Sequence, residues 1–192
     1  MSLVVSFAGQ IGSGKSSVSQ SIATEMGWPC AVFSNYLRQI AKEQGKDSNS
    51  REILQDLGQT LVKADSREFC RAVLLDGGFS KDANMLVDGV RHVNIQLDIE
   101  TLVAPASCKL IYLSAGNAER FTRVTHRLDG PRDFERAESH IVESELRDEL
   151  PAIADVIIDA ERDLHTVIAE CRLPLRKWLP PSSTLSTTCT HF

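Results

Sequence analysis

Short apolar runs alternate with longer amphipathic segments along most of the 192-residue chain. Five short runs predict buried β-strands, at residues 3–8, 31–33, 85–87, 109–113 and 156–158. Between them, apolar residues repeat every three or four positions, which predicts helices at 17–26, 36–43, 53–64, 67–75, 92–103, 118–127, 134–150 and 161–172. Strands and helices that alternate in this way predict an α/β fold, with a parallel sheet covered by helices on both faces.

Residues at the ends of these segments predict where the helices begin and end. Asn49 and Glu52 lie three residues apart, as in a capping box, and place a helix start before residue 53. Pro174 is expected to end or kink the last helix. Residues 180–192 are polar, carry no period and are expected to form a flexible C-terminal tail. We therefore expect a single domain at residues 1–179, followed by that tail.

The stretch GQIGSGKSS, residues 9–17, joins the first predicted strand to the first predicted helix. It fits G-x-x-x-x-G-K-[ST], the phosphate-binding loop, in which glycines let backbone N–H groups turn toward an anion. The expected nucleotide-binding residues are Gly9, Gly12, Ser13, Gly14, Lys15, Ser16 and Ser17. The alternative is a glycine-rich turn with a surface lysine. The strand before the motif and the helix after it favour the phosphate loop, since a helix N-terminus attracts anions.

Asp88 follows the apolar run at 85–87, where ligands bind beyond the carboxyl ends of parallel strands. A carboxylate at this place suits a Walker B position, which holds Mg²⁺ directly or through water. The Ser16 hydroxyl is the second expected metal ligand. The alternative is a simple Asp-Gly turn, because Gly89 comes next.

Arginines supply 14 of the 21 basic residues, and several cluster where a phosphorylated ligand is expected. Arg120, Arg123 and Arg127 have the spacing of one helix face, and we expect them to neutralise charge during phosphoryl transfer. Arg38 and Arg51 lie in the segment between the second and third predicted strands. Guanidinium groups bind phosphate through paired hydrogen bonds and stay protonated. The alternative for each arginine is a solvated position on the surface.

Composition narrows the class of protein further. Hydrophobic residues make up 42% and charged residues 24%, as in globular proteins, and the net charge of −5 argues against a nucleic-acid polymer as partner. No apolar stretch is long enough to span a membrane, and no secretory signal is expected. The cysteines number five and lack C-x-x-C spacing, which favours free thiols in a reducing compartment. We therefore expect a cytoplasmic protein with small-molecule ligands.

Three further motifs accompany the phosphate loop: SNYLR at 34–38, DGVR at 88–91, and the pair Arg123 and Arg127. With them the chain resembles the P-loop nucleoside and nucleotide monophosphate kinases (adenylate-kinase-like and cytidylate-kinase-like enzymes and the related dephospho-CoA kinases) over about residues 3–170. SNYLR resembles a segment whose arginine binds the acceptor phosphate, with asparagine in place of the family's aspartate. DGVR is similar to the family's Asp-Gly-Phe-Pro-Arg, one residue shorter. The arginine pair has the spacing found at the start of the family's lid.

This resemblance implies a three-layer α/β/α P-loop fold whose five-stranded parallel sheet has the order 2-3-1-4-5. It also implies a helical acceptor-binding segment at about 35–80 and a short lid at about 120–136. Mg-ATP would bind on residues 9–17 and pass its γ-phosphoryl group in line to a nucleoside monophosphate. We expect Lys15, Arg120, Arg123 and Arg127 to act in transfer, and Arg38, Arg51 and Arg91 to bind the acceptor. Of these roles, the resemblance implies those of Arg38, Arg91 and the three lid arginines.

Two other functions stay open from the sequence. One is a P-loop kinase with another acceptor, such as dephospho-CoA, whose attacking hydroxyl needs a carboxylate base that the sequence does not clearly provide. The other is a nucleotide-dependent ATPase switch or binding protein. A GTPase is disfavoured because the guanine-reading motif Asn-Lys-x-Asp is absent. The acceptor, its base and the oligomeric state are left open as well.

Overall fold

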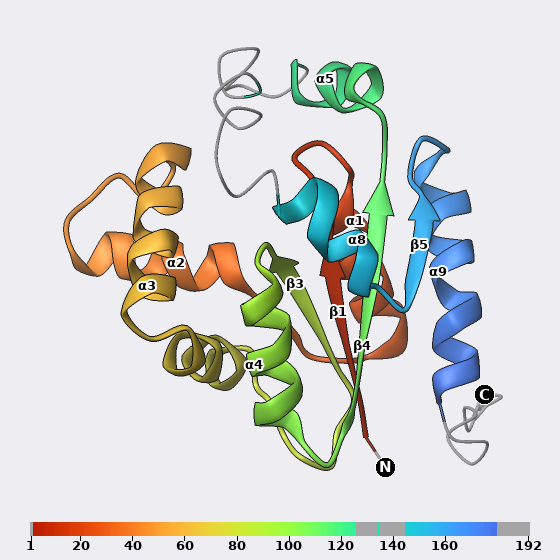
Figure 1. Cartoon of the computed structure of the whole chain (residues 1–192), viewed down its shortest axis with the longest axis horizontal. Helices are drawn as coiled ribbons and strands as arrows, with labels where there is room; N and C mark the ends of the chain where they lie inside the picture. The colour runs from red at the N-terminus through yellow and green to blue at the C-terminus, as the bar shows by residue number, and fades with distance from the viewer. Residues whose placement is uncertain (1, 126–133, 135–144, 180–192) are drawn as a thin grey trace, which may run out of the picture.

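The computed structural model describes residues 2–125, 134 and 145–179. Its centre is a five-stranded sheet in which each strand pairs in parallel with its neighbours. The strands are β1 (Leu3–Ala8), β2 (Cys30–Val32), β3 (Met85–Val90), β4 (Ser107–Ser114) and β5 (Val156–Asp159). They lie in the order β2-β3-β1-β4-β5, so the predicted fold class and strand order are confirmed (Figure 1).

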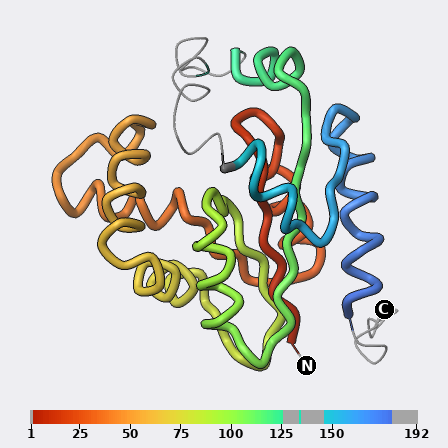
Figure 2. The backbone as a smooth tube through the Cα atoms, viewed as in Figure 1, coloured from red at the N-terminus to blue at the C-terminus, as the bar shows by residue number. Residues whose placement is uncertain are grey.

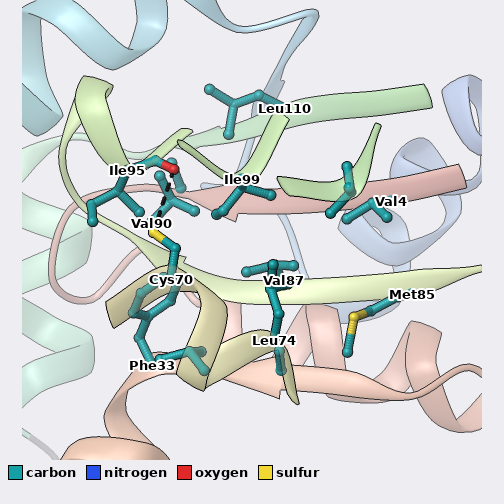
Figure 3. Close-up of a cluster of buried hydrophobic side chains, with 14 of the residues drawn as sticks. Val4, Phe33, Cys70, Leu74, Met85, Val87, Val90, Ile95, Ile99 and Leu110 are labelled. Atoms are coloured by element: carbon teal, nitrogen blue, oxygen red, sulfur yellow. Dashed lines mark hydrogen bonds between the residues drawn. The ribbon is translucent and has the colours of Figure 1, made fainter. Parts of the chain in front are cut away.

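Helices cover both faces of this sheet and give the fold its three layers. They are α1 (Lys15–Met26), α2 (Phe33–Glu43), α3 (Arg51–Asp76), α4 (Val93–Val103), α5 (Asn117–Thr125), α8 (Leu150–Ile153) and α9 (Leu164–Trp178), with a π-helical turn η1 (Glu145–Glu149) before α8. Neighbouring residues of β1 point to opposite faces. Val4 belongs to the core under α3 and α4 (Figure 3), whereas Val5 belongs to the core under α1 and α9. Both faces of β1 are therefore buried, as its apolar sequence predicts.

The helix α2 and the first half of α3 form a helical hairpin beside the sheet (Figure 2). The hairpin has a small core of its own, formed by Ala41, Leu54 and Leu57. Asp65 interrupts α3 with φ −163° and ψ 95°, and its Oδ1 accepts a hydrogen bond from Glu68 N at 2.9 Å. The predicted break between two helices at this place is confirmed. The half of α3 after Asp65 packs on the core that lies between the sheet and α4, while the half before it is one of the two helices of the hairpin.

Two predicted helix boundaries are wrong, each for a local reason. The side chain that caps α3 belongs to Ser50 rather than Asn49, because Ser50 Oγ accepts a hydrogen bond from Ile53 N at 3.4 Å. Pro174 does not end the last helix, since it lies inside α9, which continues to Trp178. Its ring is buried there, so apolar packing outweighs the loss of one backbone hydrogen bond.

Several predicted segments lie partly or wholly outside the described residues, among them the helix at 118–127, which is described up to Thr125. The tail at 180–192 is entirely outside them. The lid at 120–136 is described up to Thr125 and again at Phe134, and the helix at 134–150 is described at Phe134 and from Glu145 onward. Among the helices of the described ranges, none combines the length and the apolar character that crossing a bilayer requires.

The four described cysteines carry free thiols, as the sequence predicts. Burial is the main reason that the pKa of each thiol rises to about 12, at Cys30, Cys70, Cys108 and Cys171. A thiol is nucleophilic as the thiolate, so these side chains act as packing groups at neutral pH.

Candidate functional site

The loop that joins β1 to α1 is built around three glycines with positive φ. Gly9, Gly12 and Gly14 have φ of 152°, 81° and 85°, which L side chains rarely adopt. Two of them also lie against neighbouring main chain. A Cβ on Gly9 would lie 2.7 Å from the Leu113 carbonyl oxygen, and one on Gly12 would lie 2.6 Å from the Arg120 carbonyl oxygen. The backbone of the phosphate loop therefore packs directly against the end of β4 and the first turn of α5.

The N-terminus of α1 follows this loop without a break. Within the described chain no side chain caps the helix, and its first turn contains no acidic residue. The first N–H groups of a helix have no partner in the helix and carry partial positive charge. Lys15, Ser16 and Ser17 form this first turn, and all three line one cleft. The geometry suits a bound phosphate.

Asp88 lies inside β3, beside the start of the phosphate loop. It pairs with Phe7 of β1, and a register shift at the next position places Ala8 opposite Val90. The strand thus continues past Gly89, which has φ of 99°. The predicted strand end at residue 87 and the alternative of a simple Asp-Gly turn are both wrong, because the irregularity is a bulge within the paired strand.

The environment of Asp88 fits a cation. The side chain is 1% exposed, and its Oδ1 is buried without a hydrogen-bond partner among the described residues. Such a group costs free energy unless something binds it. Ser16 lines the same cleft, and carboxylate and hydroxyl oxygens are ligands that Mg²⁺ prefers, with phosphate and water oxygens completing the shell. After burial itself, the charge of Asp88 is the second cause that raises the pKa of Cys30 to about 12.

One cleft of about 370 Å³ connects the phosphate loop with the helical hairpin. The predicted site residues that line it are Gly12, Gly14, Lys15, Ser16, Ser17, Arg38, Arg51, Asp88 and Arg91. The structure thus brings together residues that the sequence analysis assigned separately to the donor, the metal and the acceptor. Ser13 lies behind the loop instead, with 1% exposure.

The charges in this cleft are mostly positive. Lys15, Arg38, Arg51 and Arg91 carry positive side chains, whereas Asp88 is the single carboxylate among the described residues that line the cleft. A cleft with this charge pattern attracts anionic ligands. Arg38 is oriented by its own helix, because Nη1 donates to Ser34 Oγ at 3.3 Å and to Asn35 Oδ1 at 3.4 Å.

The cleft also contains polar residues that the sequence analysis did not assign to the site. They are Gln20, Ser34, Asn35, Asn49, Gln55, Gln59 and His92. Gln55 and Gln59 lie one helical turn apart on the hairpin, so their place on a polar helix face is visible in the sequence. Amides carry no charge and fit no motif, which is why the sequence alone gave them no role.

The three lid arginines do not share one environment. The guanidinium of Arg120 is buried, with Nε donating to Ala115 O at 3.1 Å and Nη1 to Ile11 O at 3.3 Å. Arg123 is partly exposed, and its Nε lies 2.8 Å from Glu119 Oε1. Arg120 and Arg123 thus both lie beside the phosphate loop, but Arg120 is bonded to main-chain oxygens there, and the expected role of the pair in transfer stays a prediction. Arg127 lies outside the described residues.

Arg123 also lies close to the phosphate loop, beside Gly14. Its Nη1 is 3.8 Å from the position that a Cβ on Gly14 would take. Its Nη2 lies 3.5 Å from Glu161 O and 3.4 Å from Arg162 O, in the turn after β5. Arg123 therefore stands between the phosphate loop and the end of the sheet.

Comparisons with known proteins identify a family and similar folds. A family model described as an AAA domain matches residues 8–141, which is more than half of the chain. A gluconokinase from Sinorhizobium meliloti 1021 has a TM-score of 0.62 at 19% identity, covering 92% of this chain and 91% of its own. A shikimate kinase from Aquifex aeolicus vf5 has a TM-score of 0.56 at 16% identity, covering 90% of this chain and 96% of its own. Among curated proteins, none matches the sequence. At these identities the structural likeness shows the fold alone.

The contact between Gly12 and Arg120 predicts different effects for two glycine substitutions. Gly12 and Gly27 have similar φ values of 81° and 64°, but a Cβ on Gly27 would meet nothing within 4 Å. We expect Gly12→Ala to lower the free energy of unfolding by about 3 kcal/mol and Gly27→Ala by about 1 kcal/mol, measured by urea denaturation. Calorimetry should show weaker ATP binding in Gly12→Ala alone. Equal ATP affinities in the two variants would contradict the role of Gly12 in the loop.

Proposed function

The chain belongs to the AAA domain family, and on that premise we propose that it is an ATP-dependent phosphotransferase. The proposed reaction moves the γ-phosphoryl group of Mg-ATP to a nucleoside monophosphate or a similar small phosphorylated acceptor. The observation that carries the proposal is one cleft that is lined both by the phosphate loop and by Arg38, Arg51 and Arg91. Small nucleotides as partners and the cytoplasm as the location belong to the same proposal.

The donor side of the cleft uses backbone and one lysine. Positive φ at Gly12 and Gly14 turns the loop into a concave surface, and α1 adds the partial positive charge of its N-terminus. Lys15 would place a full charge at the outer phosphates, where negative charge develops during transfer. Arg123, beside Gly14, would stabilise the same charge.

Ser16 and Asp88 would hold Mg²⁺ in the cleft. Both line the cleft, and Asp88 offers a buried oxygen without a hydrogen-bond partner among the described residues. When bound, the ion neutralises phosphate charge and holds the donor oxygens in a fixed geometry. In the protein, the role of Asp88 is to present its carboxylate from a rigid central strand.

The acceptor side supports a phosphorylated compound rather than a simple alcohol. Arg38, Arg51 and Arg91 approach the cleft from three different segments, and guanidinium groups suit the dianion of a phosphate monoester. Gln55 and Gln59 supply neutral donors and acceptors of the kind that read a nucleobase edge. An acceptor phosphate is already ionised at neutral pH, so the transfer needs no general base.

A kinase with a hydroxyl acceptor is the second candidate. It is favoured by the names of the two structural neighbours, a gluconokinase and a shikimate kinase. A hydroxyl nucleophile needs a base, and Asp88 is the single carboxylate among the described residues of the cleft. Asp88 would then have to serve as metal ligand and base together, which makes this candidate weaker. Dephospho-CoA is one such acceptor. A nucleotide-binding ATPase or switch without an acceptor is the third possibility.

An acceptor panel with γ-labelled ATP tests the proposal directly. The full chain is incubated with Mg-ATP and, one at a time, nucleoside monophosphates, dephospho-CoA, gluconate, shikimate or no acceptor. We expect label on a nucleoside monophosphate, and Lys15→Ala should reduce transfer about a hundredfold or more with an unchanged circular dichroism spectrum. Label only on a hydroxyl compound would favour the second candidate, and ATP hydrolysis independent of any acceptor would favour the third.

The arginines of the hairpin should affect the acceptor more than the donor. Arg38→Ala removes a guanidinium that lines the cleft, whereas Arg71→Ala removes an exposed one that pairs with Glu68 at 3.3 Å on the second half of α3. We expect Arg38→Ala to raise the KM for the acceptor about tenfold and to change the KM for ATP less than about twofold. Arg71→Ala should leave both constants unchanged. A larger change in the KM for ATP than for the acceptor would contradict this assignment.

Asp88→Asn should weaken Mg²⁺ binding without lowering the stability of the fold. The substitution keeps the shape of the side chain and removes a negative charge buried without a partner for Oδ1 in the described structure. We expect the Mg²⁺ concentration for half-maximal transfer to rise about tenfold or more. The free energy of unfolding without metal should stay the same or rise by about 1 kcal/mol, because a desolvated charge is lost. A clear loss of stability would show that Asp88 is a structural residue instead.

A further inference from the structure

Arg120 is the largest side chain in the described chain that is almost completely buried, with 1% exposure. Removing a guanidinium from water is unfavourable unless hydrogen bonds compensate for the lost hydration. Arginine is also one of the residues least often found buried. The buried guanidinium of Arg120 therefore requires hydrogen-bond partners inside the protein.

The guanidinium of Arg120 connects the phosphate loop to the start of α5. Its Nε donates to Ala115 O at 3.1 Å and its Nη1 to Ile11 O at 3.3 Å, while its Nη2 donates to Asn117 Oδ1. Phe134 covers the group, with the guanidinium carbon 5.3 Å from the ring centroid. Ala115 and Asn117 lie at the entry to α5, whereas Ile11 lies in the phosphate loop, so one side chain ties the two together.

The bond to Ile11 sets the direction of the next peptide group. In a planar trans peptide the C=O and the following N–H point in opposite directions. The Ile11 carbonyl is held toward Arg120, which turns the Gly12 N–H away from Arg120. Gly12 also lines the cleft in which the donor phosphates are proposed to bind. Flipping this peptide would break the hydrogen bond and turn the Gly12 N–H toward the guanidinium of Arg120.

Two further contacts hold the same peptide from the side of α5. The position for a Cβ on Gly12 is 2.6 Å from the Arg120 carbonyl oxygen, so loop and helix meet main chain to main chain. The Ile11 side chain is buried in a small cluster with Val124 and Phe134. The loop is thus supported by the backbone of Arg120, by its guanidinium and by apolar packing.

We propose that Arg120 is a positioning residue for the donor phosphates. It fixes the peptide between Ile11 and Gly12 so that the Gly12 N–H stays directed to a bound polyphosphate, and it does not itself contact the nucleotide. Lysine cannot replace it, because an ammonium lacks the planar fork that reaches several carbonyl oxygens at once. The inference rests on the proposed binding of a polyphosphate by the loop.

The test compares Arg120→Lys with Arg71→Lys, which changes an exposed arginine on α3. Isothermal calorimetry on the full chain measures the Kd of ATP and of inorganic triphosphate for both variants and the wild type. We expect Arg120→Lys to weaken both ligands by the same factor, roughly tenfold to a hundredfold, and Arg71→Lys to change neither. In ligand-free spectra, the amide resonance of Gly12 should move in Arg120→Lys and stay in place in Arg71→Lys.

The possible results separate this inference from its alternatives. Unchanged triphosphate binding in folded Arg120→Lys, or an unmoved Gly12 resonance, would overturn it and leave Arg120 a stabilising residue only. A loss for ATP alone would overturn it in favour of a contact with the donor base. Wild-type protein that binds neither ligand would overturn the proposed function instead.

A second variant serves if Arg120→Lys does not fold. Asn117→Ala removes one acceptor of the guanidinium, and an equal loss of affinity of about threefold for both ligands is expected. The absence of any loss would overturn the inference.

Discussion

The phosphate loop packs on the peptide groups of its neighbours without side chains between them, and this contact constrains the rest of the site. Gly9 approaches the carbonyl oxygen at Leu113 and Gly12 approaches the one at Arg120, each at a distance that leaves no room for a Cβ. A loop held in this way has little freedom, because backbone groups cannot move aside as flexible side chains do. Its conformation is therefore set by the end of β4 and the start of α5. The N-terminus of α1 and the position of Lys15 follow from it.

The strand order explains why distant segments of the chain meet at this loop. In the sheet, β3 lies between β1 and β2, so the carboxyl ends of all three strands are adjacent. The phosphate loop follows β1, the helix α2 with Arg38 follows β2, and Asp88 lies near the end of β3. The bulge at Gly89 places the carboxylate beside the loop without ending the strand. A parallel sheet with this order makes one site from three separate sequence motifs.

Features that depend on local pattern could be predicted from the sequence, whereas features that depend on packing between elements could not. The strands, the loop motif and Asp88 are visible because each has a short apolar run or a fixed spacing. The i, i+3 spacing of Arg120 and Arg123 is also visible, but it does not tell which helix face is buried, and α5 turns Arg120 inward. Pro174 is compatible with a long helix because α9 gains its stability from burial. The amides of the hairpin belong to the cleft because α3 lines it, and no sequence motif indicates this contact.

The two ends of the cleft are built by different means, and this difference affects how each can change. At the donor end the groups that face the ligand are largely backbone, fixed by glycines and by the main core. At the proposed acceptor end they are side chains, and apart from Arg91 these lie on a hairpin with its own small core, which the break at Asp65 separates from the rest of α3. Substitutions on the hairpin can alter charge and hydrogen bonding there without disturbing the loop. The fold can therefore be shared with a gluconokinase at 19% identity and a shikimate kinase at 16% identity, since backbone geometry needs few conserved side chains. The identity of the proposed acceptor therefore depends on the side chains of the hairpin and on Arg91, because the phosphate loop is expected to contact the donor alone.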